Sequence, residues 1–254
     1  MLISVALCTF NGGRFLRVQL DSILNQTVAV GELVICDDCS TDSTLSIIHE
    51  YIARYPTIIS LHKNDTNQGA VKNFERCIQQ CKGDIIFLAD QDDVWYPFKV
   101  QLIGDYFRAK PDALLVFTDG DLIDEAGNAV HGTVWEKWNF NREMRERWRD
   151  NDLAFDDLAR NNNRVTGATL AMKNTLRQHI FPFRSNIHYW HDAWLAMYAA
   201  KYGGLSFIER SLIKYRIHAK QLVGIGNGTS GRDTRPAYKR LARKILRRFK
   251  SASA

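Results

Sequence analysis

The sequence predicts an α/β fold in which helices flank a mostly parallel, Rossmann-like sheet, and three observations support this. Short apolar runs alternate with segments of helical periodicity from the amino end onward. Two of these runs end in clustered aspartates, Asp37-Asp38 and Asp90 to Asp93. Hydrophobic residues make up 45% of the 254 residues, which is enough for a sizeable core.

The first half of the chain contains four predicted strands separated by three predicted helices. The strands are expected at residues 2–7, 32–36, 58–62 and 85–89. The helices are expected at residues 14–25, from a cap at Ser40 or Asp42 through Tyr55, and at residues 70–81. Strand–helix–strand units at this spacing predict parallel strands joined by right-handed crossovers.

The second half is less regular. We expect strands at residues 113–118, 165–170, 206–208 and 212–217, and a helix at residues 195–201. Gly167 interrupts the second of these strands and indicates a close approach of another group. Three tryptophans lie among many charges at residues 135–148, which predicts either a mobile, substrate-covering segment or a plain surface helix.

The fourth strand leads directly into three carboxylates, Asp90, Asp92 and Asp93. The carboxyl ends of strands in an open α/β sheet lie on one edge, where ligands bind, so Asp37-Asp38 should lie nearby. Carboxylates this close repel one another unless a cation lies among them. Hard oxygen ligands favour Mg²⁺ or Mn²⁺, which commonly also hold a substrate's phosphates. The alternative is a solvated acidic turn.

Several classes of protein are disfavoured. The first strand is followed by neither Gly-x-Gly-x-x-Gly nor a Walker lysine loop. No run approaches the roughly 18 apolar residues of a membrane span, and the amino end lacks the basic flank of a signal peptide, so we expect a cytoplasmic protein. The five cysteines are an odd number, which argues against a disulfide framework. Reduced thiols are favoured over the alternative, a zinc site built from Cys36, Cys39, Cys77 and Cys81.

The positive charge is concentrated near the carboxyl end. Residues 232–250 carry nine basic side chains and one acidic one, whereas the rest of the chain has a net charge of −2. We therefore predict a domain at residues 1–223, a flexible glycine-rich linker at 224–235 and a basic amphipathic helix at 236–254. Such a helix suits an anionic membrane surface; a solvated or partner-packed helix and other anions are alternatives. Nucleic acid is not expected, because no basic face or known module occurs in the body.

Five short motifs follow one another along the chain. They are Cys8-Thr-Phe-Asn-Gly-Gly13, Asp37-Asp-Cys-Ser-Thr-Asp-Ser-Thr44, Asn67-Gln-Gly69 with Asn73, Asp90-Gln-Asp92-Asp93, and His191-Asp192. In this order and spacing they resemble glycosyltransferase family 2, the inverting nucleotide-sugar transferases of the GT-A fold. Ala89 to Trp95 together with Tyr215-Arg-Ile-His218 look most like bacterial rhamnosyltransferase-like members that build surface polysaccharide.

The resemblance implies roles for particular residues. Those implied for the donor are Thr9, Phe10 and Asn11 beside the nucleoside base, Asp38 at the base edge, Asp90 at the ribose or sugar, and Asn67 and Asn73. Asp92 would ligate Mn²⁺ or Mg²⁺, with Asp93 as a competing ligand and His218 as a further one; a surface histidine is the alternative for His218. Those implied for the acceptor side are Trp95, Trp190 and His191.

Asp192 would be the general base, and desolvation between Trp190 and Trp194 would raise its pKa; a helix N-cap is the alternative. The resemblance thus implies an inverting, metal-dependent transferase that uses a dTDP-rhamnose-like or UDP-sugar donor. The acceptor would be a glycan or lipid-linked glycan, at the inner face of a bacterial cell membrane. The alternatives are a nucleotidyltransferase and a non-catalytic nucleotide- or glycan-binding module.

Overall fold

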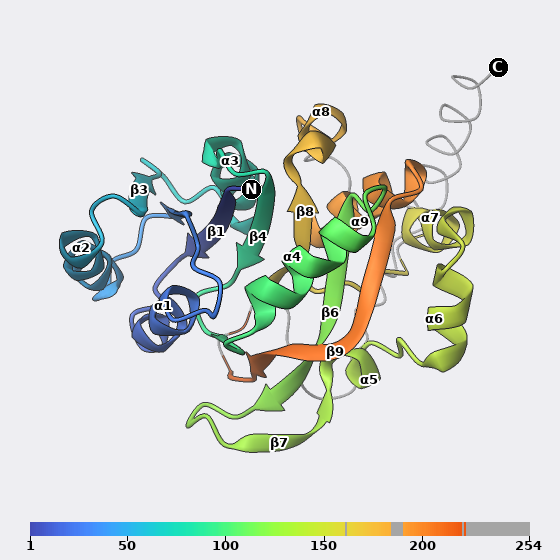
Figure 1. Ribbon diagram of the computed structural model, residues 1–254. Helices are drawn as coiled ribbons and strands as arrows, with labels where there is room; N and C mark the ends of the chain where they lie inside the picture. Colours follow the sequence, from blue (N-terminus) through green and yellow to red (C-terminus); the bar gives the residue numbers. More distant parts are fainter. Residues whose placement is uncertain (161, 184–189, 220, 222–254) are drawn as a thin grey trace.

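A computed structural model describes residues 1–160, 162–183, 190–219 and 221. The predicted linker at 224–235 and the basic helix at 236–254 lie outside the described residues. In the described part, a nine-stranded sheet is flanked by helices (Figure 1). The α/β class predicted from the sequence is therefore confirmed.

The strands are β1 (Ile3–Thr9), β2 (Glu32–Asp37), β3 (Ile59–Lys63), β4 (Ile85–Ala89), β5 (Val94–Trp95), β6 (Leu115–Ile123), β7 (Ala129–Thr133), β8 (Ala171–Lys173) and β9 (Leu205–Arg216). The α-helices are α1 (Leu16–Leu24), α2 (Thr44–Arg54), α3 (Ala70–Gln80), α4 (Lys99–Ala109), α5 (Val134–Lys137), α6 (Arg142–Trp148), α7 (Asn151–Ala159), α8 (Arg177–Ile180) and α9 (His191–Lys201). Two 3₁₀ turns, η1 (Gly167–Thr169) and η2 (Asn174–Leu176), flank β8.

The sheet has the strand order β3-β2-β1-β4-β8-β6-β9-β5, and β7 pairs with β6. Strands β1 to β4 are mutually parallel, as the strand–helix alternation predicted. Strand β8 runs antiparallel to both β4 and β6, whereas β6 and β9 are parallel. Consequently β1, β2, β4, β6 and β9 all end at the same edge of the sheet, and Thr9, Asp38, Asp90 and His218 lie at or just after these ends.

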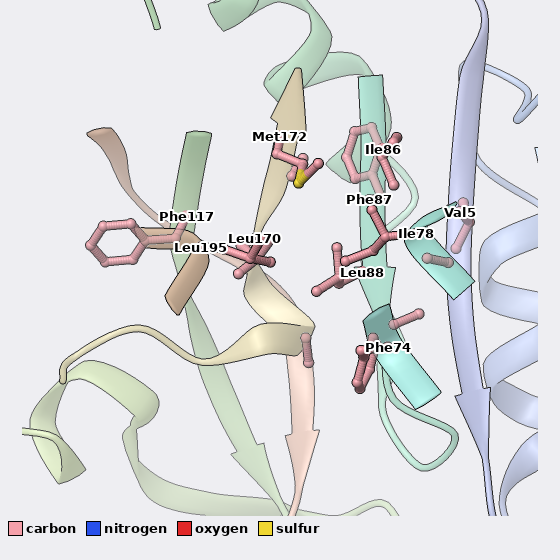
Figure 2. Close-up of a cluster of buried hydrophobic side chains, with 14 of the residues drawn as sticks. Val5, Phe74, Ile78, Ile86, Phe87, Leu88, Phe117, Leu170, Met172 and Leu195 are labelled. Carbon is pink, nitrogen blue, oxygen red and sulfur yellow. The ribbon is translucent and has the colours of Figure 1, made fainter. Parts of the chain in front are cut away.

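The core surrounds the central strands. Every residue of β1 and of β4 is buried, because helices cover both faces of this part of the sheet. Figure 2 shows side chains of β4 together with Phe74 and Ile78 of α3 and Met172 of β8. The amphipathic α3 turns Phe74, Cys77 and Ile78 toward the sheet, which explains the periodicity that predicted it.

Two segments differ from the expectations. Residues 135–148 form two short helices, and α6 lies at the surface, as one of the two expectations had it, since Trp148 is its only buried residue. Trp135 and Trp148, however, are buried around Phe140, with ring centroids 5.0 and 5.2 Å from it. Asn139, whose φ is 52°, interrupts the helical conformation between α5 and α6, so the sequence shows no single helical stripe. The two strands expected at 206–208 and 212–217 are one strand, β9, whose exposed Glu209 and Arg210 interrupt the apolar pattern.

The five cysteines are free thiols. Cys36, Cys77 and Cys81 are buried, and the Cys77 thiol contacts the carbonyl oxygen of Val34. Cys39 lies in the loop after β2, where its thiol contacts the carbonyl oxygen of Asn64. In the part of the chain that the structure describes, no helix is long and apolar enough to cross a membrane.

Candidate active site

The carboxylate turn after β4 meets the carboxyl end of β9. Asp92 and His218 lie 126 positions apart in the sequence, yet Oδ2 of Asp92 and Nε2 of His218 are 2.8 Å apart. The register explains this, since β5 follows the turn and pairs antiparallel with β9 shortly before His218. The structure thus brings together two residues that the sequence could connect only through a family resemblance.

Arg216 fixes this junction. Its backbone N–H donates to Oδ1 of Asp93 at 3.0 Å, and its guanidinium donates to the carbonyl oxygens of Asp92, Asp124 and Glu125 at 2.8 to 3.1 Å. The residue is only 4% exposed, and its guanidinium lies 4.7 Å from the ring centroid of Phe15. Arg216 was not among the predicted site residues, although it lies two positions before His218 in the motif that was recognised.

The carboxylates at this edge are electrostatically strained. Burial, followed by the charges of Asp92 and Asp192, raises the pKa of Asp90 to about 7. Burial and the charges of Asp92 and Asp90 raise the pKa of Asp93 well above its ordinary value. In addition, Oδ2 of Asp93 is buried and lacks a hydrogen-bond partner within the described ranges. A cation bound at this edge would relieve the repulsion among these groups.

The donor atoms present fit a divalent metal ion in part. Asp92 and His218 together offer carboxylate oxygen and imidazole nitrogen, which suit Mn²⁺ and, less well, Mg²⁺. No group of three or more His, Cys, Asp or Glu side chains is arranged to hold an ion in the part that the structure describes. The remaining ligands would therefore be substrate phosphates and water, as is common for these metals. Asp93 points inward and is 1% exposed, so its predicted ligand role stays a prediction.

Asp192 lies in the first turn of α9, and the N-cap position belongs to Trp190. Its Oδ1 accepts hydrogen bonds from the backbone N–H of Ala193 at 2.6 Å and from the amide of Asn163 at 3.2 Å. The backbone of Gly167 also donates to the carboxylate. Burial nevertheless outweighs these bonds and raises the pKa of Asp192 to about 7, in line with the expected desolvation. Its charge acts on Asp90, so the two carboxylates belong to one electrostatic cluster.

The three residues predicted on the acceptor side lie in different environments. Trp190 is 40% exposed beside Asp192. His191 is buried and stacks on Phe74 at 4.0 Å, and burial lowers its pKa to about 3. Both of its ring nitrogens lack partners among the residues described, so it packs beneath the helix and does not line an open surface. Trp95 is buried as well, and the acceptor-side roles of all three stay predictions.

The loop after β1 joins the carboxylate turn. Gln91 accepts from the backbone N–H of Phe10 at 2.8 Å and donates to the carbonyl oxygen of Phe10 at 3.0 Å. Phe10 is thereby held with 45% of its surface exposed, as a ring that stacks on a base would need. Asn11 adopts a positive φ of 49° and accepts from the N–H of Thr41, while Thr9 is buried and donates to Asp37.

The remaining donor-side candidates form an internal network. The two oxygens of Asp38 accept from Asn64 and from the backbone N–H groups of Gln68 and Gly69 at 2.7 to 2.8 Å. Asn73 accepts from Asn64 and donates to the carbonyl oxygen of Cys36. Asn67 is exposed and donates to the carbonyl oxygen of Asp38. Asp38 and Asn73 therefore hold the 64–69 loop in place, and their direct donor contacts stay predictions.

Two more residues support the site and were not predicted. Gln19 is fully buried in α1 and donates to the carbonyl oxygen of Asp90 at 2.8 Å. Lys99 is fully buried at the start of α4, where its ammonium donates to the carbonyl oxygen of Ala168 at 2.7 Å. For Gln19 the available signal was its place in the apolar stripe of the helix predicted at 14–25, because a glutamine is rarely buried without a partner. Lys99 lies in α4, which was not among the predicted helices.

Comparisons with known proteins identify the family and the fold. The family model described as "Glycosyl transferase family 2" matches residues 4–159. Chondroitin synthase of Escherichia coli is 33% identical over 135 residues, which are 53% of this chain and 19% of that protein. The chain therefore spans about a fifth of the length of this relative.

Two solved structures share the fold. S. aureus TarS 1-349 in complex with UDP-GlcNAc superposes with a TM-score of 0.65 at 17% identity, over 90% of this chain and 62% of that one. The mannosyltransferase PcManGT from Pyrobaculum calidifontis, in complex with GDP-Man and Mn²⁺, gives 0.64 at 17% identity, over 86% and 57% of the two chains. The described part of this chain thus has the GT-A fold that the resemblance implied.

Proposed function

The chain belongs to glycosyl transferase family 2, and on that premise we propose that it is an inverting, divalent-metal-dependent glycosyltransferase. It takes a sugar from a nucleotide-diphosphate donor and passes it to a glycan or lipid-linked glycan acceptor. The observation that supports this most is the meeting of Asp92 and His218 in a carboxylate cluster that also includes Asp192. TarS with UDP-GlcNAc and PcManGT with GDP-Man and Mn²⁺ share the fold and add support.

The donor side follows from the exposed Phe10 and the turn after β4. The Phe10 ring stacks on the nucleoside base, and Asp90 bonds the ribose or the sugar. Asp92 and His218 would hold a divalent metal ion, which when bound would supply positive charge to offset that of the leaving diphosphate. Arg216 fixes the turn that carries Asp92, because its guanidinium donates to the carbonyl oxygen of Asp92 and its backbone N–H donates to Asp93.

Asp192 removes the proton from the acceptor hydroxyl while that oxygen attacks the anomeric carbon from the face opposite the leaving diphosphate. A base serves this step best when its pKa lies near the working pH, and the pKa of Asp192 is about 7. The hydrogen bonds from Ala193, Asn163 and Gly167 orient the carboxylate. Attack from the opposite face inverts the anomeric configuration.

The finer features of the function belong to the same proposal. The resemblance of the segments around Trp95 and Tyr215 favours a dTDP-rhamnose-like or UDP-sugar donor and a role in bacterial surface polysaccharide. The basic amphipathic pattern of residues 236–254 favours a place on the anionic inner face of the cell membrane.

The test is calorimetric binding of UDP-, dTDP- and GDP-sugars in the presence of Mn²⁺, Mg²⁺ or EDTA. We expect one class of donor to bind, only with a metal ion, and Asp92→Ala to lose that binding. Asp84→Ala is the matched control. Asp84 comes just before β4, at the end of the strand away from Asp92, and its carboxylate accepts from the backbone N–H of Leu2. Failure of every nucleotide sugar to bind would refute the transferase. Donor binding that EDTA leaves unchanged would refute the role of the metal ion.

A further inference from the structure

Lys99 is an unusual residue for its position. It is the first residue of α4 and none of its surface is exposed. A buried ammonium loses its hydration, and a positive charge at a helix amino end opposes the helix dipole. A methionine would fill a similar volume without either cost. The structure offsets these costs with three kinds of contact, all of which come from the candidate active site.

The first contact is a hydrogen bond across the site. The Lys99 ammonium donates to the carbonyl oxygen of Ala168 at 2.7 Å. Ala168 lies in the turn η1, whose first residue, Gly167, donates through its backbone to the Asp192 carboxylate. Lys99 is therefore hydrogen-bonded to the same turn that contacts the proposed base, Asp192.

The second and third contacts come from the carboxylate turn. The ammonium lies 3.9 Å from the ring centroid of Trp95, which is two residues beyond Asp93. It also interacts electrostatically with Asp93 and Asp90, whose negative charges counteract the lowering of its pKa by burial, to about 7. Arg216 does not replace this charge for Asp93, since only its backbone N–H reaches that carboxylate.

We propose that Lys99 is a positioning residue that joins the two halves of the site, the carboxylate turn at Asp90 to Asp93 and the turn that orients Asp192. It acts through its hydrogen bond to the Ala168 carbonyl oxygen and its contact with the Trp95 ring, and it touches neither donor nor acceptor. This inference rests on the proposed function, because it assigns the donor to one half and the base to the other.

The role predicts an unusual combination of kinetic effects. Loss of the ammonium leaves the contact between Asp92 and His218, the proposed ligands of the metal ion, in place, so that Mn²⁺ and the donor should bind about as tightly as in the wild type. Loss of the bond to Ala168 releases the turn that orients Asp192, so that kcat falls by at least about tenfold. A residue that only stabilised the fold would weaken binding and catalysis together.

The experiment compares Lys99→Met with Lys173→Met. Lys173 also donates to a backbone carbonyl, that of Pro111, and also lies near an aromatic ring, that of Phe107, but it belongs to β8 outside the carboxylate cluster. Donor affinity is measured by calorimetry in Mn²⁺, kcat by release of nucleoside diphosphate, and folding by thermal denaturation. The wild type and Lys173→Met are assayed in parallel with Lys99→Met. Absence of activity in all three proteins would contradict the proposed function and not the role of Lys99.

We expect Lys99→Met to keep its donor affinity while kcat falls at least tenfold, and Lys173→Met to match the wild type. Lys99→Gln retains a neutral hydrogen-bond donor for the Ala168 carbonyl, so its kcat should lie between those of Lys99→Met and the wild type. If Lys99→Met does not fold, Lys99→Gln is the variant that tests the proposal. A wild-type kcat in Lys99→Met or Lys99→Gln overturns the proposal. So does a loss of kcat that an equal loss of donor affinity accompanies.

Discussion

The role of Asp192 as general base leads to a prediction that can be worked out in numbers. Replacement by asparagine keeps the size of the side chain and an oxygen that accepts from Ala193, but removes the basic group. Positioned general bases contribute about 10²- to 10⁴-fold to a rate, so we expect kcat of Asp192→Asn to fall by that factor. Donor binding should remain, because the base acts only on the acceptor.

The pH dependence gives a second magnitude for the same residue. With a pKa of about 7 in the free protein, about a tenth of Asp192 is ionised at pH 6 and about nine-tenths at pH 8. Since only the ionised carboxylate accepts a proton, kcat/KM should rise about tenfold between these pH values and level off above them. Release of nucleoside diphosphate over pH 5.5 to 9 measures this directly.

Asp90→Asn is the matched control, because Asp90 has the same pKa of about 7 but belongs to the donor side. We expect Asp90→Asn to lose activity overall and yet to retain the acid limb of the profile. The residual activity of Asp192→Asn should lack that limb. An Asp192→Asn variant that keeps a tenth or more of the wild-type kcat would refute the reasoning, as would an unchanged acid limb.

The raised pKa of Asp192 also makes the stability of the fold depend on pH. The pKa of Asp192 is about 7 in the folded state and about 3.8 in the unfolded chain, so the folded state holds its proton more tightly. The stabilising contribution of this proton is fully present below pH 3.8 and is lost as the pH rises through 7. We therefore expect the Tm of the wild type, measured relative to Asp192→Asn, to fall between about pH 4 and pH 7. The absence of such a relative change would contradict the raised pKa of Asp192 in the folded state.

Three further predictions concern single residues in and around the site. A Cβ on Gly167 would lie 2.5 Å from Nε2 of His191, so Gly167→Ala should destabilise the fold by about 1–3 kcal/mol in urea and lower kcat. In a His191→Ala background the same substitution should cost less stability, and an equal cost would contradict the close contact. Arg216→Lys loses most of three carbonyl bonds and should cost about 2–4 kcal/mol in urea unfolding; a loss below 1 kcal/mol would contradict the bracing role. Phe10→Ala should weaken donor binding by about 1–3 kcal/mol in calorimetry at unchanged Tm; unchanged binding would rule out stacking.

The first half of the fold could be predicted because local pattern and tertiary environment agree there. Strand β4 begins and ends where its apolar run does, since both of its faces are buried and its sequence is continuously apolar. The second half was harder, because burial there depends on contacts between distant segments. Trp135 and Trp148 are buried by Phe117 and Phe140, and two short helices around Asn139 leave no periodic stripe to recognise.

The site residues, like the elements of the fold, could be predicted only where the signal in the sequence is local. The clustered aspartates were visible in the sequence because a buried strand ending in acids is a local signal. The contact of Asp92 with His218 depends on the pairing of β5 with β9, which no local pattern reports. Lys99 and Arg216 were missed for the same reason, since their partners are carbonyl oxygens of distant segments and any residue supplies a carbonyl.

The stereochemistry of donor cleavage tests the central proposal most directly. Proton NMR of the wild type with its preferred nucleotide sugar and Mn²⁺, with water as the acceptor, resolves the anomer of the sugar first released and the nucleotide product. The proposal predicts the anomer opposite to that of the donor, together with nucleoside diphosphate, and no release in EDTA. Release of the same anomer, or formation of pyrophosphate in a reaction with nucleoside triphosphate and sugar phosphate, would contradict an inverting glycosyltransferase.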